Sequence, residues 1–214
     1  MDEIKEYGQG CISIAKDQRV QIITIIGEIE GHDTTTGSAK ATKYEHIIPQ
    51  MIKADYHEDV DGILILLNTI GGDVECGLAI AELIASLRKP VVSLVMGGSH
   101  SIGIPLAVSA DHSFIVPSAT MMVHPVRTTG TILGAPQTFY QFNQMQERIV
   151  TFICSHSRIK AEEFERLMFA KDTIAKDLGT ILVGEEAVSA GLIDEIGGVT
   201  EAICKLQELI LKKN

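Results

Sequence analysis

Three short apolar runs, rich in aliphatic and β-branched residues, are the first regular feature of the chain: residues 20–26, 62–67 and 91–96. Their length and composition are typical of strands buried in a parallel sheet. Between the second and third runs, from residue 73, apolar residues recur at helical spacing until Pro90 stops the pattern, which predicts a helix. A strand, a helix and a second strand in this order form a crossover unit, so the sequence predicts an α/β fold with a parallel sheet.

The crossover unit is expected to bring two glycine-rich segments together. Residues 68–73 (NTIGGD) follow the second strand as a turn, and residues 97–103 (GGSHSIG) follow the third strand. The carboxyl ends of parallel strands lie at one edge of a sheet. We therefore expect the two segments to be neighbours in space.

Further elements continue the pattern to the end of the chain. Helices are predicted at residues 44–54, 102–109, 139–153, 161–168 and 201–212, and short strands at residues 114–116 and 121–123. The apolar stripe of the helix at 139–153 is rich enough to require a partner surface. Thr200 is the expected N-cap of the last helix. Residues 31–43 have no apolar period, and we expect a mobile loop there.

Length, composition and charge narrow the class of protein. With 214 residues, 45% of them hydrophobic, and with no linker or repeat, the chain fits one domain spanning residues 1–214. Its formal net charge of −10 argues against a nucleic-acid partner, because phosphate groups would be repelled. The N-terminus has no secretory signal, and no segment reaches the roughly 18 apolar residues of a membrane helix. We expect a cytoplasmic protein without stable membrane insertion.

The four cysteines are scattered along the chain, without a paired motif or clustered histidines. This pattern indicates reduced, buried thiols rather than a disulfide framework or a zinc site. We therefore expect no metal and no cofactor.

The segment 97–103 has the features of a turn that carries a nucleophile. A catalytic serine needs a tight, exposed bend, N–H groups to hold an oxyanion, and a base within hydrogen-bond reach. Small residues allow the bend, and Ser101 starts a short helix whose N-terminal partial positive charge favours an oxyanion. The candidate oxyanion donors are the N–H groups of Ile102 and Gly72. Each loop alone is better explained as a turn or a helix cap, so the interpretation depends on their joint placement.

His124 is the candidate general base. It follows the apolar strand at residues 121–123 and precedes Pro125, which fixes the backbone just beyond it. A lone histidine is commonly a core residue bonded to a carbonyl group. The nearby serine loop favours the catalytic role instead.

Four separated segments agree in order and spacing with one motif series. They are residues 68–77 (NTIGGDVECG), 97–103 (GGSHSIG), 121–125 (MMVHP) and 185–194 (EEAVSAGLID). This series resembles that of the Clp protease proteolytic subunits, over most of the chain from about residue 20 to residue 209. Within that family, the chain is most similar to the branch of translocation-enhancing proteins.

The resemblance implies a ClpP- and crotonase-like spiral of ββα units with a protruding handle helix. A head of about residues 19–125 and 172–214 would carry the site, and a handle of about residues 126–171 would pack against a second ring. The subunits would form homo-oligomeric, stacked rings around a chamber. Substrates would be peptides or unfolded and secretory preproteins, and any AAA+ unfoldase would be a separate chain.

The resemblance also implies a role for each candidate residue. Ser101 would attack the peptide carbonyl, His124 would take its proton, and Gly72 with Ile102 would hold the oxyanion before water hydrolyses the acyl-enzyme. A substrate strand is expected to contact Gly71, Val126, Arg127 and Thr128.

The chain departs from the family pattern at two positions. The aspartate column of the family falls on Gly179, so a neighbouring residue must supply the acid: Asp177 is the first candidate and Asp172 the second. His100 stands where related peptidases carry a small residue. We expect it to pack or to contact solvent, with its ring turned away from Ser101.

Two other functions stay open at this point. A crotonase-type acyl-CoA hydratase or isomerase would use the same architecture and a two-amide oxyanion hole, and would not need Ser101 or His124. An inactive, ring-forming scaffold would fit the displaced acid, because loss of the triad acid can cost about 10⁴ in turnover.

Overall fold

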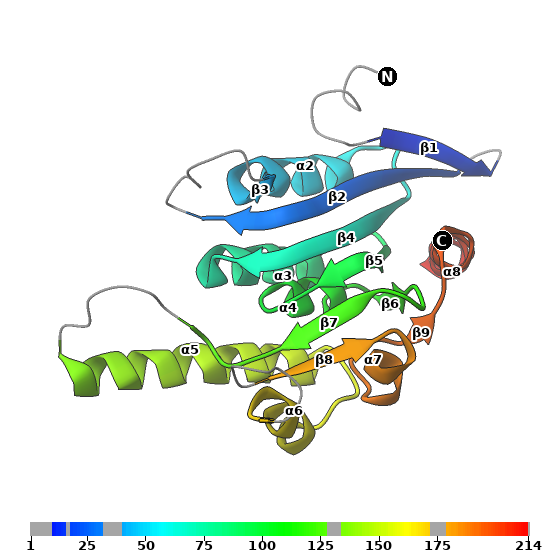
Figure 1. Cartoon of the computed structure of the whole chain (residues 1–214). Coiled ribbons are helices and arrows are strands. Elements are labelled where there is room, and N and C mark those ends of the chain that lie inside the picture. The colour runs from blue at the N-terminus through cyan, green and yellow to red at the C-terminus, as the bar shows by residue number, and fades with distance from the viewer. Residues whose placement is uncertain (1–9, 16–17, 32–39, 128–133, 172–178, 214) are drawn as a thin grey trace.

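The computed structural model describes residues 10–15, 18–31, 40–127, 134–171 and 179–213 (Figure 1). The strands are β1 (Gly10–Ala15), β2 (Gln18–Glu30), β3 (Ala41–Lys43), β4 (Gly62–Gly72), β5 (Val91–Ser99), β6 (His112–Ile115), β7 (Thr120–Val123), β8 (Thr180–Val183) and β9 (Glu195–Ile196). The helices are α2 (Tyr44–Tyr56), α3 (Val74–Ser86), α4 (Gly103–Val108), α5 (Ala135–Ser155), α6 (Ala161–Met168), α7 (Glu185–Ser189) and α8 (Val199–Lys213).

The sheet has the parallel centre that the sequence predicts. Its order is β1-β2-β4-β5-β6-β9, and β2, β4, β5, β6 and β9 pair in parallel. β7 joins β5 through the pair Gly98 and Thr120, and it pairs in antiparallel fashion with β8 (Figure 1). The crossover unit β4-α3-β5 therefore directs the ends of β4 and β5 to one edge, next to the start of β7.

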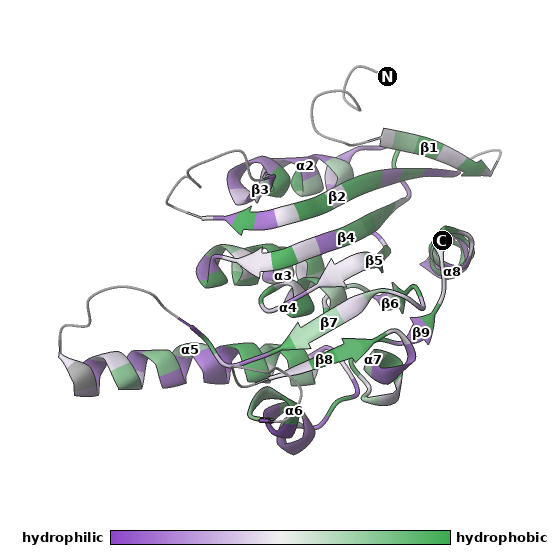
Figure 2. Cartoon of the chain, in the orientation of Figure 1, coloured by the Kyte–Doolittle hydropathy of each residue, from purple (hydrophilic) through white to green (hydrophobic). Residues whose placement is uncertain are grey.

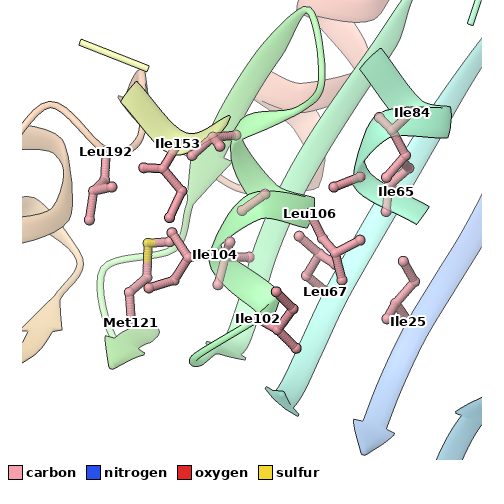
Figure 3. Close-up of a cluster of buried hydrophobic side chains, with 14 of the residues drawn as sticks. Ile25, Ile65, Leu67, Ile84, Ile102, Ile104, Leu106, Met121, Ile153 and Leu192 are labelled. Atoms are coloured by element: carbon pink, nitrogen blue, oxygen red, sulfur yellow. The ribbon is translucent and has the colours of Figure 1, made fainter. Parts of the chain in front are cut away.

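Helices cover both faces of the sheet because side chains of a strand alternate between them. Ile63 and Ile65 of β4 are fully buried in the cluster that includes α2, α3 and α4, whereas Leu64 packs with α8. Figure 3 shows part of the larger cluster, with Ile25, Ile65, Leu67, Ile84, Ile102, Ile104, Leu106, Met121, Ile153 and Leu192. Each such side chain contributes about 1.5–3 kcal/mol when fully buried, so this cluster is a main source of stability at the site edge.

The long amphipathic helix predicted around residues 139–153 is α5, and its two halves have different surroundings. Val150, Phe152 and Ile153 lie in the core, whereas Phe139 and Tyr140 are 68% and 62% exposed. Figure 2 shows hydrophobic and hydrophilic residues alternating along α5 as it extends away from the sheet. The apolar stripe therefore finds part of its partner surface within this chain.

Several predicted boundaries are wrong, for reasons that lie in the tertiary structure. Residues 68–72 continue β4 instead of forming a turn, because β2 supplies ladder partners as far as Gly72 and β5 as far as Thr69. The strand at 20–26 is not buried on both faces, since Ile26 is 43% exposed beyond the part of β2 that packs with α8.

Thr200 is not the N-cap: α8 begins at Val199, and the Glu201 carboxylate accepts a hydrogen bond from Gly198 N–H. The expected mobile loop at 31–43 lies mostly outside the described residues, and its end forms β3.

Asp55, at the end of α2, holds the loop between α3 and β5. Its side chain is buried, with Oδ1 accepting from the backbone N–H groups of Arg88 and Lys89, each at 2.9 Å, and Oδ2 accepting from Arg88 Nε at 3.1 Å.

Asp55→Ala would leave two N–H groups without their acceptor, so we expect the free energy of unfolding in urea to fall by about 1–3 kcal/mol. Asp55→Asn keeps one acceptor oxygen and should cost less. The exposed neighbour Glu58 is the control, and Glu58→Ala should change the free energy by less than about 0.5 kcal/mol.

Candidate active site

Ser101 lies on a tight turn between the end of β5 and the start of α4. It is the only non-glycine residue of the described chain with a positive φ, at 55°. The turn is held by hydrogen bonds from Ser101 N–H to the Met122 carbonyl (2.9 Å) and from Ile104 N–H to the Ser101 carbonyl (3.0 Å). A side chain in the left-handed region costs free energy, and such strain is concentrated at functional sites. The turn therefore fixes the direction in which the Ser101 side chain leaves the backbone.

The end of β4 packs directly against this turn, as the sequence predicts. His100 N–H donates to the Thr69 carbonyl at 3.1 Å, which continues the β4–β5 ladder into the serine loop. At Gly71, where φ is 92°, a Cβ atom would lie 2.8 Å from Ser101 Cβ and 2.9 Å from the His100 carbonyl oxygen. Only glycine allows so close an approach of the two segments.

A cavity of about 210 Å³ brings most of the candidate residues together. Ser101, His124, Gly72 and Ile102 all line it, and so do Val126 and Arg127 of the expected substrate strand, whereas Gly71 lies beside it against Ser101. The remaining wall is mostly apolar and consists of Val74, Ile104, Gln146, Ile149, Ile153, Phe164 and Met168. A serine, a histidine, the end of β4 and the start of the turn before α4 thus line one partly apolar space.

His124 follows β7 directly, and its ring nitrogen Nδ1 lies 2.7 Å from the Pro125 carbonyl oxygen. A carbonyl can only accept a hydrogen bond, so Nδ1 carries the proton in this contact. The other nitrogen, Nε2, is then unprotonated in the neutral ring. This is the tautomer that a general base requires.

The acid candidates, Asp177 and Asp172, lie outside the described residues, as does Thr128. Gly179, at the family's aspartate column, is described: its φ is 135°, and its N–H donates to the Ala170 carbonyl at 2.9 Å. That backbone conformation favours glycine, which gives Gly179 a conformational reason to be glycine.

His100, beside the nucleophile, packs between β5 and β7. Its Nε2 lies 2.9 Å from Thr120 Oγ1. Burial of the imidazole lowers the pKa of His100 below its ordinary value, and the nearby His124 lowers it further. The ring is therefore neutral near pH 7, and the expectation that it packs is confirmed.

The described residues contain no cluster of three side chains of the metal-ligating types. None of the helices in this part of the chain combines the length and apolarity needed to cross a bilayer.

A family model described as Clp protease matches residues 19–200 of the chain. The chain belongs to the Clp protease family. It is 50% identical over 213 residues to "Translocation-enhancing protein TepA" of Halalkalibacterium halodurans, a match that covers all of this chain and 83% of the relative. It is 26% identical over 180 residues to "ATP-dependent Clp protease proteolytic subunit" of Leuconostoc citreum, with 82% of each chain covered.

The fold is also that of this family. The solved structure of a point mutant of ClpP1 from Listeria monocytogenes superposes with a TM-score of 0.69, at 22% identity, and the match covers 85% of this chain and 94% of that chain. The resemblance seen in the sequence motifs is thus confirmed, and family and fold together support a peptidase hydrolase.

Sequence reasoning missed the part of this Clp-type cavity that comes from the second half of the chain. Gln146 of α5 and Phe164 and Met168 of α6 line it, and Gln146 Oε1 accepts a hydrogen bond from Val126 N–H at 3.3 Å. The helical periodicity identified both helices, but it gave no sign of which residues face a cavity.

Gly71→Ala tests the close approach of β4 to the serine loop. The added methyl group would collide with Ser101 Cβ and the His100 carbonyl in a backbone conformation that alanine rarely adopts. We expect the free energy of unfolding to fall by about 1–3 kcal/mol and peptide hydrolysis to fall by about 10²-fold. Ile70, 67% exposed, is the matched control, and Ile70→Ala should be as stable as the parent. A Gly71→Ala variant with unchanged turnover would contradict this account of the site.

Proposed function

We propose that this chain is a serine endopeptidase in which Ser101 is the nucleophile and His124 the general base. The observation that carries the proposal is that the strained turn at Ser101 and the imidazole of His124 line the same cavity. Gly72 and Ile102 line this cavity too, which supports their assignment as the oxyanion donors.

In the proposed reaction, Ser101 Oγ attacks the peptide carbonyl carbon and its proton passes to His124 Nε2. The carbonyl oxygen becomes an oxyanion held by the N–H groups of Gly72 and Ile102. The C–N bond then breaks, and His124 gives the proton to the leaving amine. Water attacks the acyl-enzyme and His124 takes its proton, then returns it to Ser101 Oγ as the ester C–O bond breaks, which releases the carboxylic acid and regenerates Ser101.

The imidazole must be held while it is charged. The Pro125 carbonyl accepts from Nδ1 and supports the required tautomer. Asp177, with Asp172 as the second candidate, is proposed as the carboxylate that stabilises the charged ring.

The cavity wall supports a preference for an apolar side chain before the cleaved bond, because Ile104, Ile153 and Phe164 offer no hydrogen bonds. The backbone from Val126 through Thr128 and Gly71 would flank an extended substrate.

The relative named as a translocation-enhancing protein supports secretory preproteins, or other unfolded chains, as substrates. The exposed Phe139 and Tyr140 on α5 support packing against a second copy in stacked rings, and a separate AAA+ unfoldase would deliver folded substrates.

Labelling with a fluorophosphonate probe tests the nucleophile. We expect one label per chain, located on Ser101 by mass spectrometry, with no label in Ser101→Ala and strongly slowed labelling in His124→Ala. The exposed Ser118 provides the control variant Ser118→Ala, which should label like the parent. An unlabelled parent that also fails to cut peptides would favour the inactive scaffold.

A set of fluorogenic peptides that differ only in the residue before the cut tests the cavity wall. We expect kcat/KM with leucine there to exceed that with aspartate or lysine by at least about tenfold, because a charge loses its water against apolar side chains. A preference for aspartate would instead assign specificity to Arg127, which also lines the cavity.

A further inference from the structure

The proposed reaction gives no task to His100, although this residue is adjacent to Ser101 and its ring is partly buried. His100 Nε2 contacts the hydroxyl of Thr120, the first residue of β7, and His124 follows the last residue of the same strand. A side chain of the serine loop thus reaches the strand that carries the proposed base.

The attachment of β7 to β5 is sparse, which gives this contact weight. The two strands share a single residue pair, Gly98 with Thr120. Besides that pair, the serine loop reaches β7 through Ser101 N–H, which donates to the Met122 carbonyl, and through the His100 side chain at Thr120. The His100 side chain therefore adds a hydrogen bond to two backbone contacts on this edge of β7, at Thr120 and Met122, while β8 pairs with the other edge along all four residues.

The space for the His100 ring is provided by a glycine. A Cβ atom at Gly98 would lie 3.0 Å from His100 Nε2 and 3.3 Å from Cε1, so any larger residue at 98 would press on the ring. The ring therefore lies against the β5 backbone with its Nε2 directed at Thr120.

The protonation state of His100 suits a residue so close to the base. Burial and the neighbouring His124 both lower its pKa, so the ring is neutral at neutral pH. A neutral ring does not oppose the positive charge that His124 gains in the proposed reaction.

We propose that His100 is a positioning residue: its hydrogen bond to Thr120 keeps the strand that carries His124 in register with the Ser101 turn. The inference rests on the proposed function, since it assigns His100 to the alignment of that site. Misplacement of a catalytic group by about 1 Å can cost about 10²-fold in rate, so a loosened β7 should slow turnover without weakening substrate binding.

The matched pair Thr120→Val and Thr120→Ser tests the link, because valine keeps the shape of threonine without the hydroxyl and serine keeps the hydroxyl. We expect Thr120→Val to lower kcat about tenfold with KM within about twofold of the parent, and Thr120→Ser to retain turnover. His100→Ala should match Thr120→Val, and His100→Gln, whose amide reaches as far as Nε2, should restore most of kcat. The double variant His100→Ala with Thr120→Val should lose no more than either single change, because both remove the same contact.

The outcomes separate this inference from the proposed function. Melting temperatures and Ser101 labelling of all variants show whether each is folded and whether the parent is a serine enzyme. A parent with no Ser101-dependent turnover removes both proposals. An active parent whose Thr120→Val variant keeps its kcat overturns the positioning role alone. Loss of all turnover in His100→Gln, with Thr120→Val unchanged, would make His100 a proton carrier and would also overturn it.

Discussion

The arrangement of the site depends on one steric constraint, the contact between the end of β4 and the serine turn. Gly71 lies so close to Ser101 that a single Cβ atom would not fit, and the Thr69 carbonyl accepts a hydrogen bond from His100 N–H. Because this bond continues the β4–β5 ladder, the sheet itself sets the position of the turn. The strained φ of Ser101 is tolerated since the surrounding backbone bonds leave the residue no alternative.

The topology assembles the cavity from two parts of the chain that are far apart in sequence. The crossover unit β4-α3-β5 supplies the serine turn and the glycine backbone, and β7 brings His124 to the same edge. The apolar wall comes later, from α5 and α6 through residues such as Ile153 and Phe164. Val74 and Ile104 of the first part complete this wall, so both parts of the chain shape the cavity.

The residues that sequence alone placed correctly are those whose signals are local. The apolar runs gave the central strands, helical spacing gave α6 with its bounds at Ala161 and Met168, and strand order brought the two glycine segments together. The extension of β4 to Gly72 was missed because its partners lie on β2 and β5. Gln146 was missed as a cavity residue because its role arises only when α5 packs beside Val126.

The tautomer of the His124 ring is set by a hydrogen bond to the next residue in the chain. The Pro125 carbonyl, one residue away, holds the proton on Nδ1, and the proline ring restricts the backbone that carries this carbonyl. A carbonyl has only a partial negative charge, so it selects the tautomer but stabilises a protonated imidazole less than a carboxylate would. Tautomer selection is thus built into the chain next to His124.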